Sequence, residues 1–75
     1  MPRGHISRLF LDGGYGFIEE EGHTDEIEFH SSALEKLTIE QLRPGQFVEF
    51  EKASDHRNPG RERAISVRLI EHQIF

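Results

Sequence analysis

Two short stretches of alternating side chains constrain the fold of this chain more than any other feature. The first, residues 13–18, reads Gly-Gly-Tyr-Gly-Phe-Ile. As a β-strand it has a period of two, so Tyr15 and Phe17 point to one face while Ile18 points to the other. An aliphatic side chain on one face requires a core. Two rings on the outward face predict a surface on which nucleobases stack, because every base offers a π-face to a flat ring.

The second stretch, residues 27–30, reads Ile-Glu-Phe-His. Read as a strand, it places Ile27 and Phe29 on one face, and Glu28 and His30 on the opposite face. The apolar pair again requires a core. The second stretch therefore predicts another half-buried strand, with His30 on its outward side.

At these residues the sequence resembles the cold-shock domain family. That family carries Lys-Gly-Phe-Gly-Phe-Ile and Val-Phe-Val-His-Phe-Ser on adjacent strands of a small barrel. The corresponding segments here read Gly-Gly-Tyr-Gly-Phe-Ile at 13–18 and Ile-Glu-Phe-His-Ser-Ser at 27–32. The flanking agreement lies in Gly4, Ile6 and residues 32–34, 44–50 and 64–67. The resemblance covers nearly the whole chain, from Gly4 to about Leu69.

The remaining pattern predicts an all-β fold. Alternation and turn residues predict five strands, at about 5–11, 15–20, 25–30, 46–52 and 63–69. The residues expected on their buried side include Ile6, Val48, Phe50, Ile65, Val67 and Leu69. Capping-box patterns at 32–35 and 38–41 predict short helical turns between the third and fourth strands, and 53–61 reads as a polar loop. We therefore expect a five-stranded antiparallel barrel of the oligonucleotide-binding (OB) type, with a short helical turn or 3-10 segment between strands three and four.

Length and composition bound the remaining possibilities. A chain of 75 residues predicts one domain, here a cold-shock-like domain over 1–75 with its core at about 4–70 and a tail at 71–75. Without cysteine, neither a disulfide nor a thiolate metal site supplements the core. The sequence has no apolar run near the ~20 residues that a membrane span needs, so we expect a cytoplasmic protein without membrane contact.

The charge balance predicts weak binding to nucleic acid. Fourteen acidic residues against nine basic ones give a net charge of −5. The acids gather at 19–28, whereas Arg57, Arg61, Arg63 and Arg68 make the later part basic. Phosphate contacts require clustered Lys and Arg, so base stacking would have to supply most of the affinity.

The candidate site consists of ring-bearing and arginine side chains. In a barrel of this type, ligands cross strands two and three and contact the flanking loops. The nucleic-acid-binding candidates are Tyr15, Phe17, His30, Arg8, Phe10, Arg57, Arg61 and Arg63. Tyr15 and Phe17 either stack bases or pack against a neighbouring loop or the C-terminal tail. His30 either joins the stacking surface or is a hydrogen-bonded structural residue.

The resemblance also shows where this chain departs from the family. Compared with the family pattern, a strand-one Trp, four further ring positions and a Lys are changed, to Arg8, Leu9, Glu28, Ser31, Ile39 and Gly13 respectively. Glu28 would repel phosphates but accepts a base amino group such as cytosine N4. Arg8 either stacks on bases or forms a salt bridge with Glu28. Three arginines in or beside the loop between strands four and five, Arg57, Arg61 and Arg63, either contact phosphates or serve solubility.

Three hypotheses for function follow. The first is weak, largely sequence-tolerant binding of single-stranded RNA or DNA by a monomer, with the RNA-chaperone role that the resemblance implies. The second is an OB barrel whose nucleic-acid face has been repurposed for contact with a protein partner. A role inside a larger translation or ribosome assembly is a third. No motif for catalysis, a metal or a cofactor stands out, so we expect no enzyme.

Overall fold

The protein is described here from a computed structural model that covers residues 1–55, 57 and 60–70. Its elements are β1 (Arg3–Phe10), β2 (Tyr15–Glu20), β3 (Glu26–His30), the 3-10 turns η1 (Ser31–Ala33) and η2 (Ile39–Gln41), β4 (Phe47–Ser54) and β5 (Glu62–Leu69). The expected tail at 71–75 and part of the expected loop at 53–61 lie outside the described residues.

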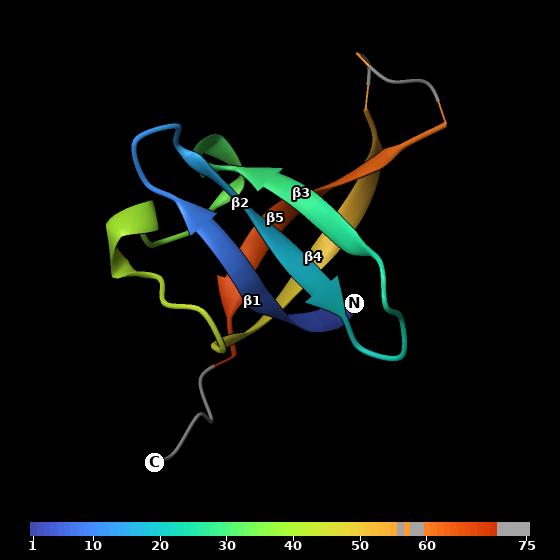
Figure 1. Cartoon of the computed structure of the whole chain (residues 1–75), viewed down its shortest axis with the longest axis horizontal. Coiled ribbons are helices and arrows are strands. Elements are labelled where there is room, and N and C mark those ends of the chain that lie inside the picture. The colour runs from blue at the N-terminus through green and yellow to red at the C-terminus, as the bar shows by residue number, and fades with distance from the viewer. Residues whose placement is uncertain (56, 58–59, 71–75) are drawn as a thin grey trace.

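The five strands close into a barrel in the order β1-β2-β3-β5-β4 (Figure 1). Four of the five strand pairs are antiparallel. The pairing of β3 with β5 is parallel, through Glu28 with Arg63 and Phe29 with Ala64. The expected barrel is confirmed, but its sheet is mixed and not purely antiparallel. The reason is topological: β4 lies between β1 and β5, so the strand that completes the closure runs in the same direction as β3.

The hydrophobic core lies inside the barrel and contains residues from all five strands. Ile6, Ile18, Val48, Phe50 and Val67 are fully buried, as expected from their alternation. Phe29, at 1% exposed, lies among them. Ile39 in η2 and Leu42 directly after it complete the same cluster. Burying these apolar side chains supplies the main favourable free energy of folding in so short a chain.

Two β-bulges shift the inward and outward alternation. In β1, Ile6 pairs with Ile18 but Arg8 pairs with Phe17, so Ser7 is an extra residue in the strand. Ile6 and Leu9 consequently both face the core, although they are three residues apart. A bulge inserts one residue and turns everything after it to the other face. Arg8, which shares parity with Ile6, is thereby turned to the outside.

The second bulge corrects the prediction for β5. Ser66 has a left-handed backbone, with φ of 51°, and the β4–β5 register shifts beside it. Ala64 and Val67 are the buried residues of this strand, while Ile65 is only half-buried. The expected inward position of Ile65 is therefore wrong, because regular alternation does not continue through the bulge. Leu69 is partly buried against the core.

The helical turns between β3 and β4 are two 3-10 turns, as expected. At η2, the Thr38 backbone N–H donates to Gln41 Oε1 at 2.7 Å, which is one half of the expected capping box. At η1, the box expected from Ser32 is wrong: His30 precedes the turn, and its Nδ1 accepts from the Ser32 backbone N–H at 3.2 Å. In the part of the chain described, neither helix is long and apolar enough to cross a membrane.

Candidate nucleic-acid interface

The outer faces of β1, β2 and β3 carry most of the candidate residues. Because of the bulge at Ser7, Phe10 lies opposite Tyr15 and Arg8 lies opposite Phe17. On the other side of β2, Tyr15 pairs with His30. We call Arg8, Phe10, Tyr15, Phe17 and His30 the ring platform. One inserted residue in β1 therefore decides whether this platform has three phenyl-type rings or two.

The three phenyl-type rings of the platform contact one another. Phe10 and Tyr15 stack with centroids 4.9 Å apart and an interplanar angle of 14°. Phe17 meets each of them edge-on, with centroids 6.0 Å apart. Such pairs stabilise a surface by about 0.5–1.5 kcal/mol beyond the area they bury. The platform is thus a preassembled apolar cluster, in which one face of Tyr15 is already covered by Phe10.

Two glycines allow this close packing. A Cβ on Gly13 would lie 2.5 Å from Cε1 of Tyr15, so the Tyr15 ring occupies space that a side chain at position 13 would need. A Cβ on Gly16 would lie 2.8 Å from Cζ of Phe29 and 2.8 Å from the carbonyl oxygen of Arg8. Gly16 thus lets the core pack directly beneath the strand that carries the platform.

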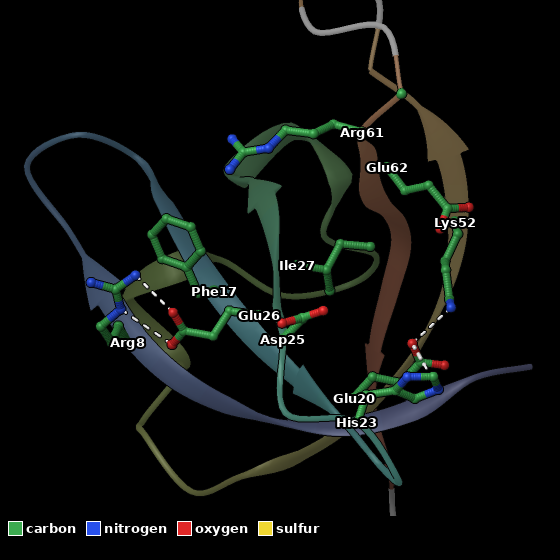
Figure 2. Close-up of a pocket in the computed structure, with 11 residues that line it drawn as sticks. Arg8, Phe17, Glu20, His23, Asp25, Glu26, Ile27, Lys52, Arg61 and Glu62 are labelled. Atoms are coloured by element: carbon green, nitrogen blue, oxygen red, sulfur yellow. Dashed lines mark hydrogen bonds and ion pairs between the residues drawn. The ribbon is translucent and has the colours of Figure 1, made fainter.

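Arg8 lies over the Phe17 ring and is held there by Glu26. Its guanidinium carbon is 4.3 Å from the Phe17 centroid, a cation–π geometry. Its Nη2 and Nε donate to Glu26 Oε1 and Oε2 at 2.8 and 3.2 Å (Figure 2). The salt bridge expected with Glu28 is wrong in its partner, since Arg8 reaches diagonally across β2 to Glu26. Stacking and ion pairing, posed as alternatives for Arg8, occur together.

Glu26 has a second donor that the sequence did not indicate. Ser7, the extra residue of the bulge, donates from its hydroxyl to Glu26 Oε2 at 2.6 Å. This hydrogen bond, together with the bonds and the charge of Arg8, lowers the pKa of the Glu26 carboxyl. The carboxylate is therefore charged at neutral pH and offsets the charge of Arg8.

His30 lies at the β3 end of the platform. Its Nδ1 is 3.1 Å from the Ser32 hydroxyl oxygen and also caps η1, so the ring is oriented by the turn that follows it. The side chain is nevertheless exposed. The structural role considered for His30 is present, and it leaves the exposed part of the ring on the same face as Tyr15.

The three candidate loop arginines do not gather at one point. Arg57 and Arg63 line a small pocket of about 100 Å³ with Glu28 and His30. Arg61 instead lines an open cleft of about 610 Å³ beside Phe17 and extends across it from the β4–β5 side (Figure 2). They therefore lie at two separate pockets beside the platform.

The cleft also contains a cation that sequence reasoning did not single out. Lys52 Nζ lies 2.7 Å from Glu20 Oε1, and this hydrogen bond raises the pKa of Lys52. Asp25, Glu26 and Glu62 line the same cleft. The face therefore changes along the strands, from acidic near the β2–β3 turn to aromatic near the β1–β2 turn.

A closed OB-type barrel with ring side chains on the outer faces of β1 to β3 is the architecture of many small domains that bind single-stranded nucleic acid. The comparisons with known proteins are more specific. Residues 3–70 match the 'Cold-shock' DNA-binding domain family. The chain belongs to this family, as the sequence motifs indicated.

Two relatives illustrate the similarity. Cold shock-like protein CspLB of Listeria monocytogenes is 38% identical over 67 residues, which cover 89% of this chain and 100% of that protein. Cold shock protein CspA of Staphylococcus saprophyticus is 37% identical over 59 residues, covering 79% of this chain and 88% of that protein. The match therefore extends over nearly the whole length of both relatives.

Proposed function

We propose that this chain binds single-stranded RNA or DNA by stacking bases on the ring platform, weakly and with little dependence on sequence. The observation that carries the proposal is the cluster of Phe10, Tyr15 and Phe17 on the outer face of the barrel. Membership of the cold-shock DNA-binding domain family supports it. Stacking is worth about 1–3 kcal/mol per base and is tolerant of sequence.

The weakness of binding follows from how the platform is already occupied. Phe10 covers one face of Tyr15, and Arg8 lies over Phe17. A base must share these surfaces or displace the groups on them. Glu26 neutralises Arg8, and the net charge of −5 repels phosphates at long range. Both effects lower the affinity below that of a platform with free rings and free cations.

An RNA-chaperone role is consistent with this mode of binding. Bases that stack on Tyr15 and Phe17 are not available for intramolecular pairing, so a weak and dispersed interaction keeps strands open. We propose that a monomer suffices, since every platform residue comes from one barrel. The loop arginines would add phosphate contacts at the two sides of the platform.

The test is a titration of backbone amide resonances with a short oligopyrimidine, at low and at moderate salt. We expect saturable shifts at Tyr15, Phe17 and His30. Phe17→Ala should weaken binding about 5- to 150-fold, the loss of one stacked base. Phe47→Ala is the matched control, because this ring is 53% exposed on β4, outside the platform.

The second candidate function is a protein-interaction module. The observation that favours it is the acidic part of the same face, where Glu26 and Glu28 lie beside Phe17. A basic protein partner would fit this region. If the double variant Tyr15→Ala/Phe17→Ala remains folded and keeps its oligonucleotide affinity, stacking is refuted and the protein-partner function becomes the better account.

A further inference from the structure

Glu28 and Arg63 lie side by side where β3 pairs with β5. We call this parallel contact the seam of the barrel. They are paired residues of the parallel strands β3 and β5, so both side chains leave the sheet on its outer face. Both are exposed. In the part of the chain that the structure describes, neither side chain has a hydrogen bond or ion pair. Among the described residues, a hydrogen-bond acceptor without a partner therefore stands next to a group of donors without one.

This pair adjoins the surface on which a base would stack. Glu28 is the direct cross-strand neighbour of Phe17. Arg8 approaches the Phe17 ring from β1, on the opposite side of β2. A base can therefore reach the Phe17 ring from the side of β3. A base that enters from there turns one of its edges toward Glu28 and Arg63, at the small pocket that both residues line.

The two side chains offer an acceptor beside donors. A glutamate carboxylate only accepts hydrogen bonds, and a guanidinium only donates them. Cytosine and adenine present the complementary pattern on their Watson–Crick edge, an amino donor next to a ring-nitrogen acceptor. Uracil, thymine and guanine present a carbonyl oxygen at the place of the amino group. With this exocyclic oxygen at Glu28 and the ring nitrogen at Arg63, acceptor meets acceptor at the carboxylate and the ring N–H meets the guanidinium donors. These bases match the pair only in the reverse order.

We propose that Glu28 and Arg63 form an edge-reading site that takes the exocyclic group at C4 of a pyrimidine or C6 of a purine at Glu28 and the adjacent ring nitrogen at Arg63. At one nucleotide position it thereby selects cytosine and adenine, which carry an amino group there, over uracil, thymine and guanine, which carry a carbonyl group. The proposal rests on the proposed function, since it requires a base on the platform. It makes Glu28 more than a repulsive charge: the carboxylate is unfavourable to phosphates but favourable to an amino group. The preference concerns one position, so the remaining stacked bases stay sequence-tolerant.

The decisive experiment compares hexamers of cytidylate and of uridylate with the same protein at one salt concentration and neutral pH. The two ligands have the same charge and ring size. We expect cytidylate to bind about fivefold more tightly or better, the lower range for one base-edge contact. Glu28→Gln should bring the ratio close to one, chiefly by improving uridylate binding, because the amide both accepts and donates.

A matched control separates base reading from bulk charge. Glu21→Gln removes the same charge at the exposed β2–β3 turn. It should raise both affinities equally and leave the ratio unchanged. Arg63→Met should reduce the ratio and weaken both ligands. A uridylate hexamer with one adenine or one hypoxanthine repeats the comparison within purines, and we expect adenine to bind more tightly.

The outcomes distinguish this inference from the function on which it rests. If both hexamers bind wild type equally, Glu28 is a surface acid only and the edge-reading site is refuted, while stacking stands. A ratio that survives in Glu28→Gln refutes the assignment to Glu28. If neither hexamer binds, the proposed function fails, and the edge-reading site fails with it.

Discussion

Replacing Gly16 by alanine should destabilise the barrel, although the added methyl group is apolar. The new Cβ would lie 2.8 Å from the carbonyl oxygen of Arg8 and 2.8 and 2.9 Å from two carbons of the Phe29 ring. Non-bonded carbons prefer separations of about 3.5–4.0 Å. The Arg8 carbonyl belongs to the paired strand β1, and Phe29 is buried in the core. Relief therefore requires β1, the core or both to move.

The expected magnitude follows from two opposing effects. Overpacking a well-filled interior costs about 1–3 kcal/mol. Alanine also restricts the unfolded chain, which returns about 0.4–1 kcal/mol. The net loss in free energy of unfolding is about 1–2 kcal/mol. In a domain of this length each kcal/mol lowers Tm by about 4–8 °C, so we expect a fall of about 4–16 °C.

The measurement is thermal and urea unfolding followed by circular dichroism. Gly13→Ala is the control, because its Cβ would meet only the Tyr15 ring, at 2.5 and 2.8 Å. That ring is half-buried on the outer face of the barrel, so it can shift without moving the backbone or the core. Stability should then fall by only about 0.5–1 kcal/mol, the lower range for a lost ring contact, while the Tyr15 ring resonances shift. A Gly16→Ala protein with wild-type Tm, or a Gly13→Ala protein equally destabilised, would refute this reasoning.

Three further predictions test the core, two arginines and the Glu26 carboxylate. Phe29→Ala should lose about 3–5 kcal/mol, a large share of the ~4–11 kcal/mol typical of this length, and urea unfolding would show an early midpoint; a midpoint near wild type contradicts the assigned core. Arg61→Gln should make the salt dependence of oligonucleotide affinity shallower by about 0.7 in log–log slope, whereas Arg8→Gln should change it less because Glu26 already neutralises Arg8; equal changes would argue against that neutralisation. The pKa of Glu26 is lowered in the folded state, chiefly by the Ser7 hydrogen bond, so its contribution to stability is present above its ordinary pKa of 4.5 and is lost as the pH falls through the lower folded value. Wild type should therefore exceed Glu26→Gln in Tm at pH 6 and lose that advantage in acid, and a gap that persists at pH 2 would count against the carboxylate as its source.

The sequence predicted the strands well where local pattern decides the structure. β2 has the predicted bounds, 15–20, because a glycine turn precedes it and alternation is regular within it. Ile6, Val48 and Phe50 are buried as predicted. Their positions depend only on local parity and on the need of a short chain to bury its aliphatic and aromatic residues.

What the sequence did not predict depends on inserted residues and on pairing between strands. The bulge at Ser66 turned Ile65 away from its expected position, and no residue pattern marks it. The bulge at Ser7 placed Phe10 against Tyr15, so the ring cluster is larger than parity alone indicates. These contacts follow from register, which is set by the whole barrel.

The charged partners were mispredicted for a related reason. Arg8 was expected to pair with Glu28, its neighbour across Phe17, but a long side chain also reaches the diagonal position, where Ser7 adds a second donor to Glu26. That choice leaves Glu28 without a partner among the described residues. Glu28 could be identified from the sequence as a carboxylate at a ring position of the family, whereas its surroundings became visible only in the structure.

The parallel contact between β3 and β5 has a consequence for how the barrel opens. Only two residue pairs join these strands, and a single bridge from Leu34 to Val67 continues the contact beyond them. Proteins open locally where few contacts must be broken, so we expect the barrel to open at this seam at a lower free-energy cost than between β1 and β2. Amide hydrogens along it should exchange with solvent before those between β1 and β2. A base held by both Glu28 and Arg63 would bridge the two strands, so slower exchange at the seam would accompany occupation of the edge-reading site.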